Sequence, residues 1–352
     1  MEEINNTPTK KDFKKLYLGI AIGVVVLLVG FTLVLATGIW KPSWSPFQVN
    51  ALKMFNSSVE RISDLEYYHA DLSIDVDIVD NGEEIGLEYD VFTDIDVSTE
   101  IPKSSTELTV GIISQGIKMI LNAEAIEYGE VAYFKLKGIP MLIRMQLTAL
   151  GIDISQYADK WYRFDPAELG ISFDDDELAE GVRQAWNNHS VIRFVKRLEQ
   201  EVINNENTYH YLFSIDEEEA KEYILDVLNL LQGGLADIPG TEFDEVYAEL
   251  DKLFNAISPI EFEVWIGKST HVLYKVRYKK YVDSTTLQAG GISVSQEDME
   301  DIMDITAEFS ISDLNIPKTI TQPAESESLL ELFMPIFEMF QDPSCIDGTC
   351  SY

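Results

Sequence analysis

The chain has 352 residues, and its 61 aspartates and glutamates against 26 lysines and arginines give a formal net charge of −35 and a pI near 4.3. This acidity excludes nucleic-acid binding through a basic surface, because phosphate contacts need clustered lysines and arginines. Hydrophobic residues make up 46% of the chain, which is enough to bury a core and excludes an intrinsically disordered protein.

The first forty residues predict a membrane anchor. A tail of residues 1–15 precedes 25 consecutive uncharged residues, 16–40. About 20 apolar residues suffice to span a bilayer, so this segment is long enough for a transmembrane helix. Tyr17 at one end and Trp40 and Trp44 at the other are aromatic residues of the kind found at membrane–water interfaces.

Charge predicts the orientation of this segment. Residues 1–15 carry four lysines and three acidic residues, a net charge of +1, which leaves −36 on the rest of the chain. The positive-inside rule therefore places the tail in the cytoplasm and the C-terminal body outside, as a single-pass protein of the cell membrane with a retained signal-anchor. The competing interpretation is a signal peptide that is cleaved after the poor site Val34-Leu35-Ala36. The apolar region of a signal peptide is usually about 7–15 residues long, which is shorter than segment 16–40.

Residues 41–47 are interpreted as a spacer, and residues 48–315 as one extracytoplasmic domain. Its first element is an amphipathic helix, whose apolar residues recur at helical spacing: Leu52, Phe55, Val59 and Ile62.

The clearest pattern in the chain follows this helix. Apolar and polar residues alternate from Tyr68 to Ile78, which predicts a strand with one buried and one wet face. Asn81-Gly82 is a strong hairpin signal, and a return strand alternates from Ile85 to Val97. Further strands are expected around Leu108, Val110 and Ile112, and at 117–126 and 130–137.

The middle of the chain is predicted to be more helical. The expected elements are a short helix over 141–150, a short strand over 160–164, a helix opened by Asp174–Asp176, a strand from Tyr209 to Ile215, a helix capped by Asp216, and a helix from Thr241. The second of these helices is expected to carry an apolar stripe that runs through Trp186 and His189 to Ile192 and Val195.

Strands return at 260–267, 272–282 and 302–311. The complete order predicts an α+β fold: a large curved antiparallel sheet, half-open and barrel-like, with helices packed on one face, preceded by the transmembrane helix.

Residues 316–352 form a C-terminal extended segment, an apolar helix and a tail bounded by cysteines. Ser328-x-x-Glu331 is a capping box, and the run up to Phe340 is apolar nearly all round. Such a helix docks on the core, or it plugs a cavity or contacts a protein partner or the membrane through residues 328–340. Cys345 and Cys350 are expected to form a local disulfide, with two free thiols or a two-ligand metal fragment as the alternatives.

No catalytic motif is present in the sequence. It contains no Gly-x-Ser-x-Gly, no phosphate-binding glycine loop and no His-Glu-x-x-His, and its four histidines lack metal-binding spacing. We therefore expect no enzyme activity, no catalytic residue, no cofactor and no metal site. Calcium binding by Asp75 and Asp77 or by Asp174–Asp176 is an alternative to a solvated acidic surface.

The order of elements resembles the LolA-like lipoprotein-carrier superfamily, in particular its LppX/LprG-like branch. The matching pieces are the leading helix before the strand Tyr68–Ile78, the Lys160-Trp161-Tyr162 strand before a helical insert, and the strand and turn Glu263–Thr270 before Val272–Val276. The resemblance covers residues 50–315. It implies a half-open barrel wrapped round helices, with an apolar cavity that shields acyl chains. Members are usually lipid-anchored or soluble, whereas this chain lacks the lipobox cysteine.

The leading hypothesis is a non-enzymatic, membrane-anchored extracytoplasmic protein with an apolar cavity for a lipid or another hydrophobic ligand. The candidate cavity residues, which can equally be plain core, are Tyr68, Leu72, Ile74, Leu87, Tyr89 and Trp265. The alternatives are a cell-surface structural or protein-interaction module without a small ligand, and a hydrolase with two isolated, buried carboxylates in a cavity.

Overall fold

The computed structural model describes residues 51–329, apart from 81–82, 115, 142–143, 146–147, 149–156, 170–174, 235–249, 252–253, 255–257 and 284–301. The predicted membrane segment 16–40 with Tyr17, Trp40 and Trp44, the cysteines Cys345 and Cys350, and nearly all of the apolar segment 328–340 lie outside these residues. Within the described part of the chain, no helix is both long and apolar enough to cross a membrane.

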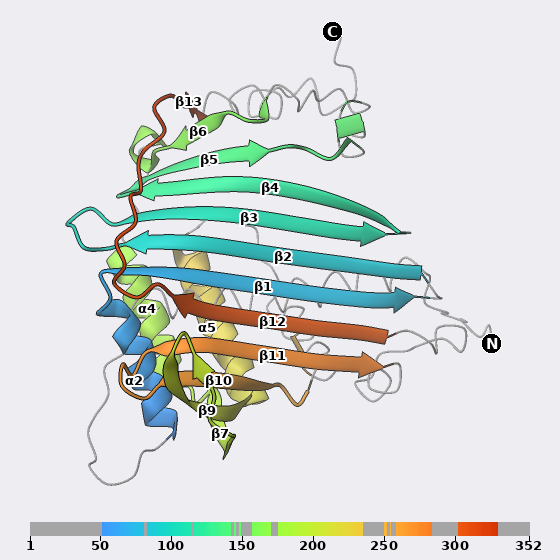
Figure 1. The fold of residues 1–352 in the computed structure, drawn as a ribbon, viewed down its shortest axis with the longest axis vertical. Coiled ribbons are helices and arrows are strands. Elements are labelled where there is room, and N and C mark those ends of the chain that lie inside the picture. Colours follow the sequence, from blue (N-terminus) through green and yellow to red (C-terminus); the bar gives the residue numbers. More distant parts are fainter. Residues whose placement is uncertain are drawn as a thin grey trace.

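One sheet dominates the fold (Figure 1). Its thirteen strands run in the order β13-β6-β5-β4-β3-β2-β1-β12-β11-β10-β9-β7, with β8 paired to β9. Every pair is antiparallel except β13 with β6, which confirms the predicted antiparallel sheet. The strands are β1 Tyr67–Asp80, β2 Glu83–Asp96, β3 Lys103–Ser114, β4 Ile117–Tyr128, β5 Val131–Lys137, β6 Trp161–Phe164, β7 Ile192–Arg197, β8 Val202–Ile203, β9 Glu206–Ile215, β10 Glu261–Gly267, β11 Leu273–Asp283, β12 Ile302–Ser312 and β13 Glu327–Ser328.

The predicted alternation on β1 is confirmed, and it defines the two faces of the sheet. Ile74, Val76 and Ile78 are buried on what we call the inner face, while the intervening aspartates lie on the outer face. Asp80 pairs with Glu83, so β1 and β2 form the antiparallel hairpin that the Asn-Gly signal predicts.

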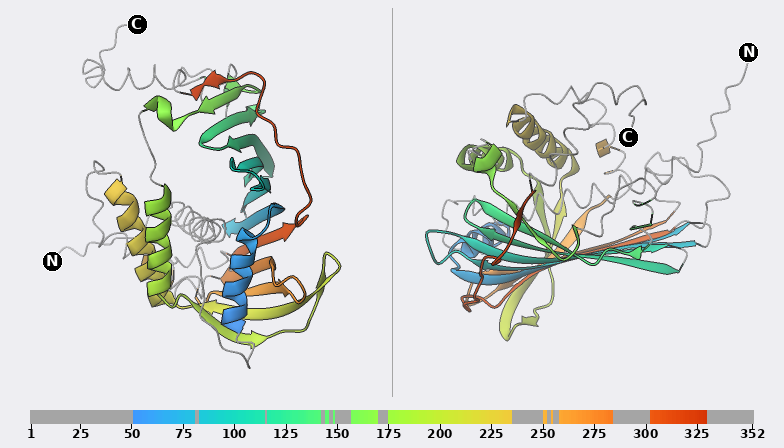
Figure 2. Two further views of the ribbon diagram at one scale, coloured as in Figure 1. Left: turned by 90° about the vertical axis from the view of Figure 1, so that its left-hand side faces the viewer. Right: turned by 90° about the horizontal axis from the view of Figure 1, so that it is seen from above.

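The helices whose bounds are described are α2 Ala51–Ser63, α4 Asp175–Asn188, α5 Glu217–Gly234 and the short 3-10 helix η2 Pro166–Leu169. Figure 2 shows that the sheet curves strongly and that α4 and α5 stand on its concave side. The apolar stripe of α2 is buried as predicted, and the ring of Phe55 lies 5.3 Å from that of Phe213 in β9. Asp216 caps α5, since its Oδ1 accepts from the amide of Glu219 at 3.4 Å.

Burial is unequal along the inner face. The largest fully buried side chains include Phe55, Phe213, Ile74, Ile266 and Ile305, and among the described residues none of them comes from β2–β5. The core therefore lies where α2 contacts β7, β10 and β11, and the inner face of β2–β5 is less completely covered.

One predicted helix is too long. The stripe expected to continue to Val195 breaks at the end of α4, because Ile192 and Val195 belong to β7, where Ile192 pairs with Ile215. Ile192-Arg-Phe-Val is rich in β-branched and aromatic residues, which suit a pleated strand. Its apolar residues fit both the spacing of a helix and that of a strand, and the pairing with β9 selects the strand.

Residues 313–326 form a strap that leads from β12 past the ends of the intervening strands to β13, which pairs with β6 (Figure 1). The sheet thus takes in a strand beyond the domain boundary predicted at residue 315. The strap is held at its start, where the amide of Asn315 donates to the carbonyl oxygen of Tyr67 at 2.7 Å. It is held at its end by an ion pair between Lys160 and Glu327 at 2.8 Å.

A polar network ties the middle of the strap to the outer face. Lys318 Nζ donates to Asp94 Oδ1 at 2.5 Å, and the ring nitrogens of His69 lie 2.6 Å from Asp94 and 2.8 Å from Asp71. Partial burial raises the pKa of Asp94, but the hydrogen bonds from Lys318 and His69 outweigh it and hold that pKa below its usual value. The pKa of Lys318 is raised, chiefly by the same hydrogen bond.

We predict that Lys318→Met lowers the free energy of unfolding by about 1 kcal/mol near neutral pH. The pKa of Asp94 is depressed in the folded state, so its contribution is present above the unfolded pKa of about 3.9 and is lost as pH falls through the folded value. The difference between wild type and variant should therefore shrink on acidification, as measured by chemical unfolding across pH. Lys279→Met, on an exposed β11 residue without an ion pair among the described residues, is the control. Equal effects of the two substitutions would contradict the prediction.

Candidate functional site

A hollow of about 290 Å³ lies on the inner face, over β2, β3, β4 and β5. Ligand pockets commonly measure about 300–1,000 Å³, so the hollow matches a small ligand or part of a longer one. Its lining is Tyr89, Val91, Thr106, Leu108, Ala123, Glu124, Ala125, Phe134, Lys135 and Leu136.

Small side chains on β4 explain why the sheet is hollowed here. The register aligns Leu108, Ala123 and Leu136 in one cross-strand row, and Thr106, Ala125 and Phe134 in the next. In each row an alanine of β4 lies between larger side chains of β3 and β5, so the surface of the sheet is lower over β4 than over its two neighbours. Alternation turns the side chains of Glu124 and Lys135 to the outer face, where Lys135 Nζ lies 3.5 Å from Glu124 Oε2.

The lining is apolar with two hydroxyl groups. Burial raises the pKa of Tyr89, so its phenol is neutral at physiological pH and can donate a hydrogen bond. Thr106 Oγ1 lies 3.1 Å from the hydroxyl of Thr93. At the rim the ring of Phe134 remains 43% exposed, so the hollow opens to solvent. An apolar surface with a few hydroxyl groups suits a ligand that is mostly hydrocarbon.

Of the six predicted cavity residues, Tyr89 alone lines the hollow. Ile74 is fully buried in the core, and Tyr68, Leu72 and Leu87 are half-buried against that core. Four of the other predicted residues thus lie on the same face of the sheet but pack in or against the core and do not line the hollow. A usable signal was present in β4, where Ala123 and Ala125 occupy the inward positions of an otherwise large-residue pattern.

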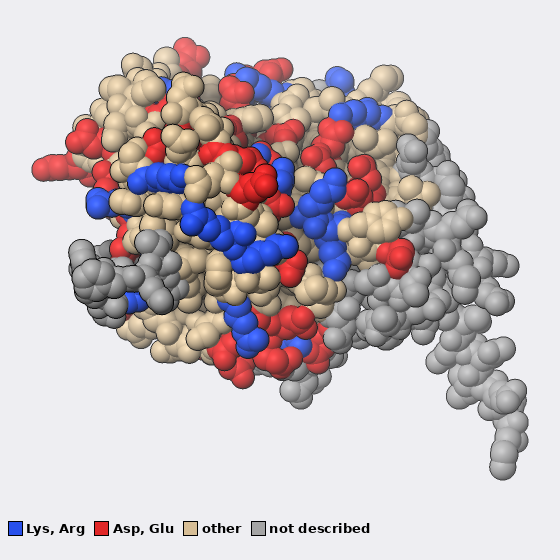
Figure 3. Space-filling view, turned by 60° about the horizontal axis from the view of Figure 1, so that its bottom comes forward, with Lys and Arg blue, Asp and Glu red and all other residues tan. Residues whose placement is uncertain are grey.

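Trp265 faces away from the hollow. It pairs with His210 and Lys275 on the outer face, is only 1% exposed, and stacks on the His210 ring with 4.2 Å between ring centroids. The neighbouring cations are paired, Lys275 with Glu308 at 2.5 Å and Arg277 with Glu263 at 2.9 Å. Figure 3 shows lysines and arginines among carboxylates on this side of the molecule. Trp265 is therefore a structural residue of a polar face.

The hollow does not have the two isolated carboxylates that the hydrolase hypothesis requires. Glu124 is the one carboxylate among the described residues that line it, and it is paired with Lys135 and Lys137.

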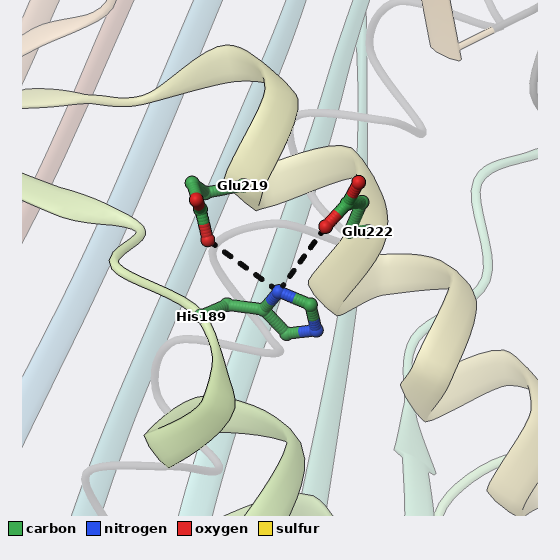
Figure 4. Close-up of side chains that lie close together, drawn as sticks. All are labelled: His189, Glu219 and Glu222. Carbon is green, nitrogen blue, oxygen red and sulfur yellow. Dashed lines mark ion pairs between the residues drawn. The ribbon is translucent and has the colours of Figure 1, made fainter.

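A second group of polar side chains lies where α4 meets α5, and Figure 4 shows His189 between Glu219 and Glu222. His189 follows the last residue of α4, so it does not belong to the helical stripe predicted for it. Among the described residues, these three are the ones that group with metal-ligand spacing. The candidate calcium ligands Asp75 and Asp77 are not part of such a group, and the side chains of Asp174–Asp176 lie outside the described part.

Comparison with known proteins yields structural matches at low sequence identity. No protein-family model matches the chain, and no curated protein matches its sequence significantly. The structure of lipoprotein LppX from Mycobacterium tuberculosis matches at 13% identity, over 78% of this chain and 100% of that one, with a TM-score of 0.30. LprF from Mycobacterium bovis matches at 12% identity, over 79% and 99%, with a TM-score of 0.35. A putative outer membrane lipoprotein-sorting protein domain from Vibrio parahaemolyticus matches at 12% identity, over 78% and 96%, with a TM-score of 0.21.

LppX is a protein of the branch that the sequence analysis names, so the predicted resemblance is confirmed as a likeness of structure.

Proposed function

We propose that this protein is non-enzymatic and binds a lipid or another hydrophobic ligand in the hollow over β2–β5. The observation that carries the proposal is an apolar hollow of about 290 Å³, open at Phe134, in an otherwise acidic protein. Burying apolar ligand surface there gains roughly 25 cal/mol per Å², while the Tyr89 hydroxyl can accept or donate a hydrogen bond to a polar end of the ligand.

The surroundings of the hollow favour the same function. Ile112 and Ile117 also lie on the inner face and remain 38% and 52% exposed. These two side chains add exposed apolar surface to the same face of the sheet. A chain with several carbons beyond the hollow can continue along these side chains.

We further propose that residues 16–40 anchor the protein in the cell membrane, with Tyr17, Trp40 and Trp44 at the interfaces and the domain outside the cell. The apolar length of the segment and the lysines before it support this topology. A protein fixed in this way holds its ligand or hands it over at one place, because it cannot diffuse away from the membrane.

We propose that the apolar C-terminal segment 330–340 either covers the hollow or contacts another protein. It continues from β13, which pairs with β6, and β6 lies next to the Phe134 and Leu136 strand. This attachment point supports a plug or lid within reach of the hollow, and it also leaves the segment available to a second subunit.

Filling the hollow should weaken binding. We predict that Ala125→Phe weakens binding of a fluorescent fatty acid at least about tenfold, equivalent to ~1.4 kcal/mol, because the new ring occupies the floor between Thr106 and Phe134. The measurement is fluorescence titration of the full chain in detergent micelles, together with native mass spectrometry of lipids that co-purify with it.

Ala132→Leu is the matched control, since Ala132 lies on the same face of β5 but outside the lining, and it should bind the probe as wild type does. If wild type binds neither probe nor lipid, the ligand-binding function is refuted and a protein-interaction module becomes the better explanation.

Removing residues 330–352 tests the C-terminal segment. This truncation keeps β13 and the Lys160–Glu327 ion pair, so the edge of the sheet stays intact. If the segment covers the hollow, the truncated protein should take up the fluorescent fatty acid faster and more tightly, as followed by stopped-flow fluorescence. Unchanged uptake and unchanged thermal stability would refute the plug.

A further inference from the structure

We propose that His189, Glu219 and Glu222 bind a divalent transition-metal ion, for which Zn²⁺ is the best fit. This site is separate from the hollow, and the proposal does not depend on the proposed function.

Two helices bring the three side chains together. His189 immediately follows Asn188, the last residue of α4, while Glu219 and Glu222 are three residues apart in the first turns of α5 and so share one face of that helix. The amide of Ser190 donates to Glu219 Oε2 at 3.0 Å, which holds one carboxylate in place. The His189 side chain is only 12% exposed, so the site is shielded on the imidazole side.

The distances fit a shared ion better than direct hydrogen bonds. His189 Nδ1 lies 3.5 Å from Glu219 Oε2 and 3.6 Å from Glu222 Oε2, beyond the usual range of about 2.7–3.2 Å for N–H···O. In a tetrahedral zinc site with bonds of about 2.0–2.2 Å, neighbouring ligand atoms are roughly 3.3–3.6 Å apart. The two separations of His189 Nδ1 from the glutamate oxygens match this geometry, and all three ligand atoms lie within 4.8 Å of one another.

Asp226 orients the imidazole for this role. Its Oδ2 lies 2.9 Å from His189 Nε2 and can accept the proton of a neutral ring only from that nitrogen, which leaves the lone pair on Nδ1. Figure 4 shows that Nδ1 is directed at Glu219 and Glu222. A lone pair directed at two carboxylates is repulsive unless a positive charge lies between them. A carboxylate behind a ligating histidine is also the usual outer partner in zinc sites.

The described residues provide no other cation for these carboxylates. Glu219, Glu222 and Asp226 form ion pairs with His189 alone, and the nearby Lys221 is taken by Glu218 at 3.0 Å and Asp251 at 2.5 Å.

His69 shows the contrasting arrangement. It also lies between two carboxylates, but both contacts are at hydrogen-bond distance, and Lys318 provides the positive charge 2.5 Å from Asp94.

Ligand chemistry selects the metal. An imidazole nitrogen with two carboxylates suits Zn²⁺ and related transition metals, whereas Ca²⁺ and Mg²⁺ prefer sites built of oxygen. With three protein ligands, a fourth tetrahedral position is left for water. The bound ion would join the end of α4 to the first turns of α5.

The test uses the full chain in detergent micelles. Equilibrium dialysis against ZnCl₂ in excess MgCl₂ should give one saturable equivalent of Zn²⁺, and CoCl₂ should give the visible absorption of tetrahedral Co²⁺, lost when Zn²⁺ is added. His189→Gln and Glu222→Gln should remove this equivalent. Asp226→Asn should weaken it by about 10–100-fold, the loss typical of an outer-shell partner.

His69→Gln and Glu218→Gln are the matched controls and should leave the binding unchanged. Glu222 is 64% exposed, so its substitution tests the site even if His189→Gln fails to fold. The proposal is overturned if wild type binds no saturable Zn²⁺, if Glu222→Gln binds it equally well, or if His69→Gln loses it too. In the first case a protonated His189 supplies the positive charge instead.

Discussion

The structure depends on the two-residue period of its antiparallel strands. Each strand places alternate side chains on opposite faces, and the register carries that division from one strand to the next across the whole sheet. Because apolar residues occupy the same parity in neighbouring strands, one face is continuous and apolar from β9 through β1 to β5. A shift of one residue in any strand would turn its apolar side chains to the outer face.

Coverage of that apolar face is what distinguishes core from candidate site. Over β9–β12 and β1, Phe55 and the rest of α2 complete a tightly buried core. Over β2–β5 the same face carries two alanines among larger residues, and the result is a hollow instead of close packing. The proposed ligand takes the place that further side chains occupy in the core.

The outer face shows how an acidic protein manages its charge. Asp94 and Glu263 each have a cation within hydrogen-bond distance, Lys318 and Arg277 respectively, so these carboxylates are part of the structure. At the α4–α5 junction the carboxylates outnumber the positive groups. The excess of negative charge in this chain is thus partly neutralised within the fold, and the α4–α5 junction is a place among the described residues where an external cation is proposed to balance it.

The sequence alone determined the strands β1–β6 and β9–β12, the β1–β2 hairpin, the division into faces and the apolar stripe of α2, because periodicity is a local property that each segment carries by itself. It did not determine the end of α4, since Ile192 and Val195 fit both a helical and a strand pattern and pairing with β9 decides between them. Nor did it locate the hollow, because free space depends on neighbours such as Leu108, Ala123 and Leu136 that come from three strands. The meeting of His189 with Glu219 and Glu222 likewise arises only when α4 and α5 pack together, since no local spacing encodes a contact between residues about thirty positions apart.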